Sequence, residues 1–173
     1  MADGPASEPT DFFAGLLQDH ARIEARLAAF EQAVDTLSKA ENDAAALAVV
    51  VETLAFFATE GALHEEVEER TLFPRLQGLS EFRQIVSALE FQHRMNRTEG
   101  EQLAACVGQF GPGRGRELRR VAFRFVEMHR GHAFAEERAL FPLAAARLSQ
   151  QEVAEMGRET SARRTAPRPS ETR

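Results

Sequence analysis

The chain has 173 residues, of which 43% are apolar, and a formal net charge of −6 at pH 7. This length allows one domain with a sizeable core, and the acidic balance lacks the basic footprint of a nucleic-acid-binding protein. No apolar run looks long enough to cross a bilayer, the first residues do not form a signal peptide, and the single cysteine suits the reducing cytoplasm.

Four stretches of the chain carry apolar residues at steps of three and four, which is the spacing of a helix with one buried face. These stripes run from Phe13 to Leu37, from Leu47 to Leu72, from Phe82 to Phe110 and from Leu118 to Leu143. We expect the first helix to start after Thr10 and the second to be capped by Asn42 or Asp43. Pro74, and Gly78 soon after it, mark the expected end of the second helix, and Ser80 is the expected N-cap of the third.

Short connections, such as "GPGRG" at 111–115, force neighbouring helices to run antiparallel. The sequence therefore predicts an all-α protein, an up-down-up-down four-helix bundle over residues 11–156. A short fifth helix can follow, because "SQQE" at 149–152 matches a capping box. We expect residues 1–10 and the basic tail 157–173 to be disordered.

The predicted apolar stripes also contain polar residues that are costly to bury. All five histidines of the chain fall on them, and Glu68 and Glu136 face inward, each one turn after a histidine. A lone inward histidine is most often a core residue with one hydrogen bond, but a buried carboxylate needs a partner or a cation. No lysine lies on these faces, and the nearest basic residue, Arg97, cannot balance both glutamates.

A local repeat shows how these residues can meet. "HEEVEERTLFPRL" at 64–76 returns in altered form as "HAFAEERALFPLA" at 132–144, 68 residues later. Each copy places a glutamate four residues after its histidine, on the same helical face. Each half of the chain also offers one histidine from its other helix, so folding the halves around a pseudo-twofold axis gathers four imidazoles and two carboxylates in one layer.

This donor set predicts a site for two metal ions, each bound by two histidines and bridged by both glutamates. Iron or manganese suits it best, zinc is an alternative, and calcium or magnesium is not favoured. Two divalent ions between two carboxylates also leave room for a hydroxide or oxide bridge. The predicted ligands are His20, His64, Glu68, His93, His132 and Glu136.

With these motifs the chain resembles the hemerythrin-like family, the HHE cation-binding domains, from about residue 11 to 147. The carriers of the resemblance are His20, "HEEVEERTLFP", His93 and "HAFAEERALFP". The resemblance implies a helical bundle with a non-haem di-iron site held by the six residues above. Oxygen-carrying members have a second histidine on the third helix, where this chain has Leu89 and Arg97. They also end the fourth-helix motif with an aspartate five residues after its histidine, whereas here Glu136 comes four residues after His132. The pattern is more similar to the family's iron–sulfur repair, nitric-oxide-responsive and peroxide-consuming branches.

Three further residues are candidates for roles around the metals. His129 could be an extra ligand, a hydrogen-bond partner of a ligand or a proton shuttle, or a polar residue without a chemical role. Glu65 is a second candidate for an extra ligand, and Glu24 could hydrogen-bond a ligand imidazole or simply face solvent. Gly61 and Gly100 could leave a channel above the metals, although packing explains both equally well.

We expect a cytoplasmic di-iron protein that binds or reacts with peroxide, dioxygen or nitric oxide, without a nucleic-acid or membrane partner. Whether it turns over a substrate stays open. The alternative is a binding module for iron, oxygen or nitric-oxide sensing, iron storage or repair, which reports to an unknown protein partner. A metal-free structural bundle is the third reading, and it predicts that replacing His64 and Glu68 with leucine stabilises the fold.

Overall fold

A computed structural model of the chain describes residues 12–165. Within these residues every regular element is helical and there is no strand, which confirms the all-helical class. The disorder expected for residues 1–10 and the helix start expected after Thr10 lie outside the described residues, as does the end of the basic tail, 166–173.

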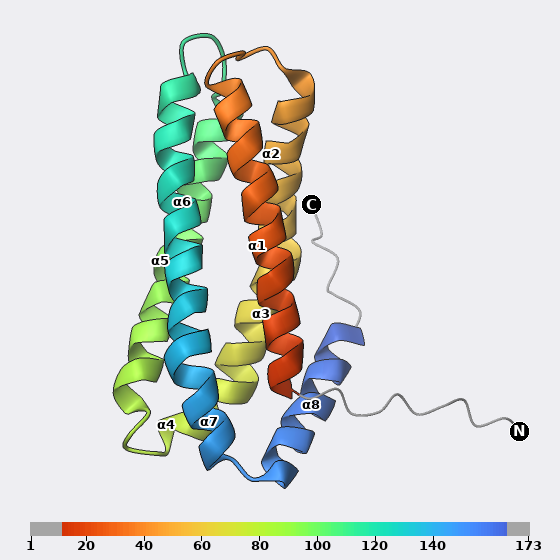
Figure 1. Ribbon diagram of the computed structural model, residues 1–173, viewed down its shortest axis with the longest axis vertical. Helices are drawn as coiled ribbons and strands as arrows, with labels where there is room; N and C mark the ends of the chain where they lie inside the picture. Colours follow the sequence, from red (N-terminus) through yellow and green to blue (C-terminus); the bar gives the residue numbers. More distant parts are fainter. Residues whose placement is uncertain (1–11, 166–173) are drawn as a thin grey trace, which may run out of the picture.

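Four long helical segments run side by side, and a further helix lies along one end of the bundle (Figure 1). The η labels mark π-helical turns that continue the helices around them. The elements are α1 (Phe12–Leu37), α2 (Ala44–Phe56), η1 (Phe57–Gly61), α3 (Ala62–Val67), η2 (Glu68–Leu72), α4 (Phe73–Gln77), α5 (Arg83–Gly108), α6 (Gly115–Ala135), η3 (Glu136–Leu140), α7 (Phe141–Arg147) and α8 (Gln150–Thr165). Helix α8 packs against α1, α3 and η2.

The helix starts follow the expected capping chemistry in two of three cases. The Asp43 side chain accepts a hydrogen bond from the backbone N–H of Ala46 at 2.9 Å, and so caps α2. Ser149 and Glu152 exchange side-chain and backbone hydrogen bonds of 2.8 and 3.3 Å, so the predicted capping box starts α8. Ser80 is not the N-cap of α5: that helix begins at Arg83, and the Ser80 hydroxyl bonds its neighbour's carboxylate instead.

The fifth helix is longer than predicted, and the expectation of a disordered tail is wrong for residues 157–165. Helix α8 continues to its end at Thr165 because ion pairs attach its polar face to the bundle. Arg75 donates to Glu159 at 2.6 Å, and Arg164 pairs with the buried carboxylate of Asp19.

The second segment ends at Gln77 with Gly78 as its C-cap, which is the later of the two expected end signals. Pro74 does not end the segment, because a π-helical turn precedes it. In η2 the backbone N–H of Phe73 bonds the carbonyl of Glu68, five residues back. Pro74 then falls in the first turn of α4, where a missing N–H is tolerated. Pro142 occupies the same place at the start of α7, after η3.

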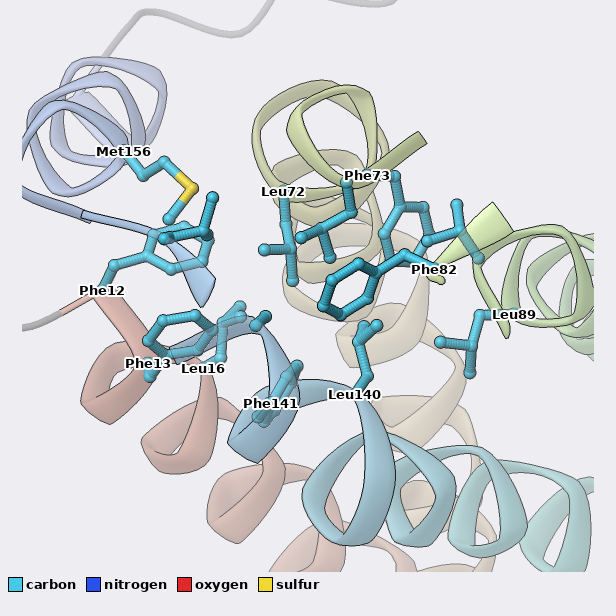
Figure 2. Packing of buried hydrophobic residues seen from close by; sticks show 14 of the residues in the cluster. Phe12, Phe13, Leu16, Leu72, Phe73, Phe82, Leu89, Leu140, Phe141 and Met156 are labelled. Carbon is cyan, nitrogen blue, oxygen red and sulfur yellow. The ribbon is translucent and has the colours of Figure 1, made fainter. Parts of the chain in front are cut away.

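The apolar core has two parts, which lie on either side of the layer that contains the six predicted ligands. One cluster gathers where α4, α7 and α8 meet; Figure 2 shows its aromatic centre around Phe73, Phe82 and Phe141. The other fills the opposite half of the bundle around Phe30 and Phe125. Two dry clusters therefore enclose the polar layer from both ends of the bundle.

The second helical segment contradicts the expectation that no apolar run is long enough to cross a bilayer. The helix Ala44–Gln77 is long and apolar enough to cross a membrane by length and composition, with a mean hydropathy of 1.7 over its best 18 residues. A core helix of a soluble bundle can meet the same criteria. Here, however, only 22% of that window is buried, so much of this apolar helix lines the surface of the bundle.

Candidate metal centre

The six predicted ligands converge in one buried layer, and none is more than 5% exposed. Helix α1 supplies His20, α3 supplies His64, α5 supplies His93 and α6 supplies His132, while Glu68 and Glu136 are the first residues of η2 and η3. They form two groups in which one ligand atom per residue lies within 4.8 Å of the others. The groups are His20 and His64 with both glutamates, and His93 and His132 with both glutamates.

Each glutamate directs one carboxylate oxygen at each group. Glu136 places Oε2 3.2 Å from Nε2 of His20 and Oε1 3.2 Å from Nε2 of His132. Glu68 places Oε1 3.6 Å from Nε2 of His64 and Oε2 3.3 Å from Nε2 of His93. Within each group the two Nε2 atoms are 3.1 and 3.0 Å apart. This is the arrangement that two bridging carboxylates require.

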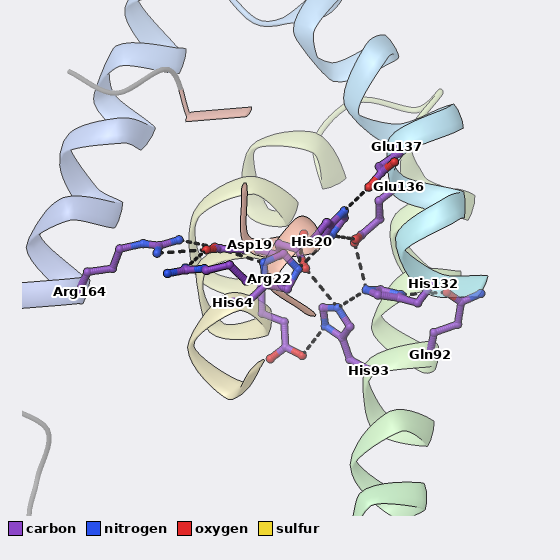
Figure 3. Close-up of polar contacts among 12 residues, drawn as sticks. Asp19, His20, Arg22, His64, Gln92, His93, His132, Glu136, Glu137 and Arg164 are labelled. Atoms are coloured by element: carbon purple, nitrogen blue, oxygen red, sulfur yellow. Dashed lines mark hydrogen bonds and ion pairs between the residues drawn. The ribbon is translucent and has the colours of Figure 1, made fainter. Parts of the chain in front are cut away.

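The Nδ1 atoms of the four histidines face polar partners outside the layer (Figure 3). The pairs are His20 with Glu137 at 2.9 Å, His93 with Glu69 at 2.9 Å, His132 with the Gln92 side-chain oxygen at 3.0 Å, and His64 with Asp19 at 3.5 Å. An acceptor at Nδ1 favours the tautomer with its proton there, so the Nε2 lone pairs point into the layer.

Sequence analysis missed these four partners, although a signal was present. Asp19 and Gln92 directly precede the first histidine of each half, and Glu69 and Glu137 are the second glutamate of each "EER". Both "EER" copies therefore supply a predicted bridge and, next to it, a partner for a histidine of another helix.

The "LFP" of each copy orients a histidine from the other half of the chain. The ring of Phe73 stacks on His93, and the ring of Phe141 stacks on His20, with centroids 5.6 and 5.5 Å apart. These contacts hold the two imidazoles between an aromatic face and a carboxylate. In each copy of the repeat, the phenylalanine of "LFP" thus orients a histidine by packing, and the second glutamate of "EER" contacts the same histidine at Nδ1.

Asp19 links the layer to α8. Its carboxylate is 4% exposed and pairs with Arg164 of α8 and Arg22 of α1, on the far side from His64. Burial raises the pKa of Asp19, but the contacts with His64 and Arg164 outweigh burial and hold that pKa below its ordinary value. A charged Asp19 thus faces His64 at neutral pH.

Glu68 and Glu136 are fully buried, and none of their four oxygens has a hydrogen-bond partner among residues 12–165. This is typical of carboxylates that bind a cation. Burial and the neighbouring Glu136 raise the pKa of Glu68 to about 8. Burial acts in the same direction on Glu136, but His132 and His20 outweigh it and lower its pKa. Four inward imidazole nitrogens with two such carboxylates fit transition-metal ions.

Protons compete for this layer when no cation is bound. Burial opposes a charged His20, yet its contact with Glu136 dominates and raises the pKa of His20 to about 9. Metal loading would therefore displace protons from the layer.

The other candidates lie outside the two groups. Glu24 is paired with Arg130 at 2.8 Å and does not reach a ligand imidazole; that prediction is wrong, and Glu137 takes the place at His20. Glu65 bonds Arg97 at 2.9 Å and shares a third, partly buried group with Glu69 and His93.

His129 is likewise absent from the two groups. Its Nδ1 donates to the Phe125 carbonyl at 2.8 Å, and burial lowers the pKa of His129 to about 4, so that its ring is neutral.

Comparison with protein families places this geometry in a known context. The family model described as hemerythrin HHE cation binding domain matches residues 11–144. A search of curated proteins gives no match.

Proposed function

Because the chain belongs to the hemerythrin HHE cation-binding domain family, we propose that its buried layer holds two iron ions. The first would be bound by His20 and His64 and the second by His93 and His132, with Glu68 and Glu136 as bridges. The observation that carries this assignment is the split of each carboxylate, one oxygen toward each histidine pair. Manganese would suit the same donors as well, and zinc is an alternative.

We further propose that the loaded site binds and reacts with peroxide, dioxygen or nitric oxide. When bound, two adjacent irons would supply reversible electron changes to such a ligand. The chain contributes orientation through the four Nδ1 contacts and exclusion of water through the apolar clusters at both ends of the layer. Glu137, whose side chain is 41% exposed, would hold a proton at the boundary between His20 and solvent.

The remaining parts of the proposal concern topology and setting. We take the four long segments to run up-down-up-down and the protein to act in the cytoplasm, without a nucleic-acid or membrane partner. The short connections support the topology, the acidic composition speaks against a nucleic-acid partner, and the single cysteine suits the reducing cytoplasm.

Metal content measured by mass spectrometry on untagged protein from iron-replete cells tests the assignment. We expect about two irons per chain, in line with the two residue groups, and loss of both in the double variant Glu68→Ala/Glu136→Ala. The matched control is Glu24→Ala, which removes an exposed carboxylate of the same bundle and should retain the metal. Less than a few tenths of any transition metal per chain after reconstitution would refute the site. Peroxide consumption and nitric-oxide binding assays then identify the ligand.

One observation favours a second function, a module that senses the state of the site and reports it. Asp19 connects His64 to Arg164 of the surface helix α8. A change of charge at the layer would change the strength of the ion pair between Asp19 and Arg164, and so how firmly α8 is attached to the bundle. Limited trypsin digestion tests this hypothesis, because cleavage within α8 should be slower when iron is bound. Equal cleavage rates with and without iron would exclude the sensing function and leave binding of, or reaction with, the small ligand.

A further inference from the structure

A cleft of about 650 Å³ lies between the second helical segment and α5, and it reaches the candidate metal centre. Its walls contain seven small residues, five alanines and two glycines: Ala55, Ala58, Gly61, Ala62, Gly100, Ala104 and Ala133. His20, His64 and His132 line its buried end. An occupant of this cleft would therefore contact the histidines of both predicted iron sites.

The cleft results from how the helices pair. Helix α2 packs mainly on α1 and α5 mainly on α6, whereas α2 and α5 meet at few positions. This leaves apolar surface uncovered, as at Val51, which is 51% exposed. Phe57 closes one side, where its ring contacts Phe125 and His129 with centroids 4.8 and 4.5 Å apart. A concave apolar surface of this kind is typical of a ligand site.

The volume exceeds what the proposed small ligands require. Dioxygen, nitric oxide and peroxide each have only two heavy atoms, whereas 650 Å³ corresponds to about twenty water molecules at about 30 Å³ each. It falls within the range of roughly 300–1,000 Å³ that is usual for sites of larger organic ligands.

Asn96 gives the cleft a specific polar feature. It lies one helical turn after His93, lines the cleft and is 3% exposed, yet neither its Oδ1 nor its Nδ2 has a hydrogen-bond partner within the described part of the chain. A buried amide without a partner is costly, and a ligand hydroxyl or carbonyl would satisfy it.

The charges around the cleft favour an uncharged ligand. Of the two carboxylates that line it, Glu65 is paired with Arg97 and Glu101 is exposed, so neither offers a buried site for a cation. Arg97 is already paired with Glu65 and Glu69, and the neutral ring of His129 offers only Nε2 as an acceptor, since Nδ1 donates to a backbone carbonyl. No unpaired positive charge among the cleft-lining residues is therefore available for an anionic head group.

We propose that the cleft binds a small, uncharged organic molecule, with its apolar body along the alanine and glycine walls and its hydrogen-bonding group at Asn96. This inference goes beyond the proposed reaction with small inorganic ligands, because it rests on the walls and on Asn96 and not on the metal. A second copy of the chain could cover the outer rim, but it would leave the amide of Asn96 without a partner below the surface.

Displacement of a fluorescent probe tests the proposal on the full chain. The probe is N-phenyl-1-naphthylamine, an uncharged molecule with one N–H, and the lack of tryptophan and tyrosine keeps protein emission low. The competitors are naphthalene and 2-naphthol, which differ only by a hydroxyl. Gly100→Leu should fill the cleft, since a Cβ at Gly100 meets only a Phe125 ring atom at an ordinary 3.8 Å. Gly108→Leu, on the same helix with nothing within 4 Å, is the matched control.

We expect Gly100→Leu to weaken probe binding at least tenfold and Gly108→Leu to leave it unchanged. Asn96→Leu should weaken 2-naphthol about fivefold to tenfold, the value of one hydrogen bond, and naphthalene much less. If Gly100→Leu does not fold by circular dichroism, Ala104→Phe replaces it. Equal binding by the filled variant, or an equal effect of Asn96→Leu on both competitors, would overturn the proposal. So would a parent chain that is a dimer in light scattering and dissociates in the filled variant.

Discussion

At pH 7 and without metal, Glu68→Gln should raise the free energy of unfolding above that of the parent. The same change should remove much of the stabilisation that bound metal provides. Glutamine keeps the shape of the side chain but has no ionisable group. Burial raises the pKa of Glu68 from 4.5 to about 8, so between these values the folded chain retains a proton that the unfolded chain has lost. The free energy of unfolding therefore falls as the pH rises through this window, by about 1.4 kcal/mol per unit.

At pH 7 the parent has lost about 3 kcal/mol of its free energy of unfolding in this way, and the glutamine variant has not. This difference corresponds to about 6–12 °C in Tm for a chain of this size. Thermal unfolding followed by circular dichroism in EDTA should show near-equal Tm values at pH 5 and a more stable variant at pH 7. With ferrous iron under anaerobic conditions the order should reverse, because the variant lacks one bridging carboxylate.

Glu127→Gln, on an exposed side chain of α6 without a hydrogen bond or ion pair among residues 12–165, is the control and should change neither Tm nor its pH dependence. The reasoning is refuted if Glu68→Gln destabilises the metal-free chain at pH 7, or if the difference from the parent is the same at pH 5 and pH 7. Either result would mean that the histidines stabilise the Glu68 carboxylate without a cation.

Three further changes test other parts of the structure. Arg164→Ala should lower the free energy of unfolding by about 1–3 kcal/mol in urea titrations, because Asp19 stays buried with one cationic partner fewer, and the loss should shrink in acid as that carboxylate protonates. Burial lowers the pKa of His129 to about 4, so between pH 6.5 and 4 the folded chain binds fewer protons than the unfolded chain. As the pH falls through this range, the Tm of the parent should therefore fall more than the Tm of His129→Asn. Gly115→Ala should lower Tm by an amount equivalent to about 1–3 kcal/mol, because its Cβ would lie 3.0 Å from a backbone carbonyl of α1.

The helices and the six converging residues could be predicted because one periodicity encodes both. A histidine and a glutamate four positions apart on an apolar stripe must face the interior together, as His64 and Glu68 do. Local rules also predicted the cap at Asp43 and the capping box that begins at Ser149.

The failures came from contacts between distant parts of the chain. Helix α8 offered few apolar residues, and the pairs that hold it join residues 84 and 145 positions apart. Glu24 was a candidate for a hydrogen bond to a ligand imidazole, but the carboxylate that contacts His20 belongs to Glu137, 117 positions from that histidine. The end expected at Pro74 assumed an uninterrupted α-helical register, which the π-helical turn before it does not keep.

Two of the three π-helical turns in residues 12–165, η2 and η3, place the same short sequence in two different surroundings, whereas η1 lies outside the repeat. η2 begins at Glu68 and η3 begins at Glu136, at the same position of two repeats whose surroundings differ: α8 packs against the first. An irregularity that recurs in unlike environments is encoded by what the copies share, which is "EER", one variable residue and "LFP". The placement of Glu68 and Glu136 is thus a local property of about seven residues, and such a segment could be transferred as a unit to another helical bundle.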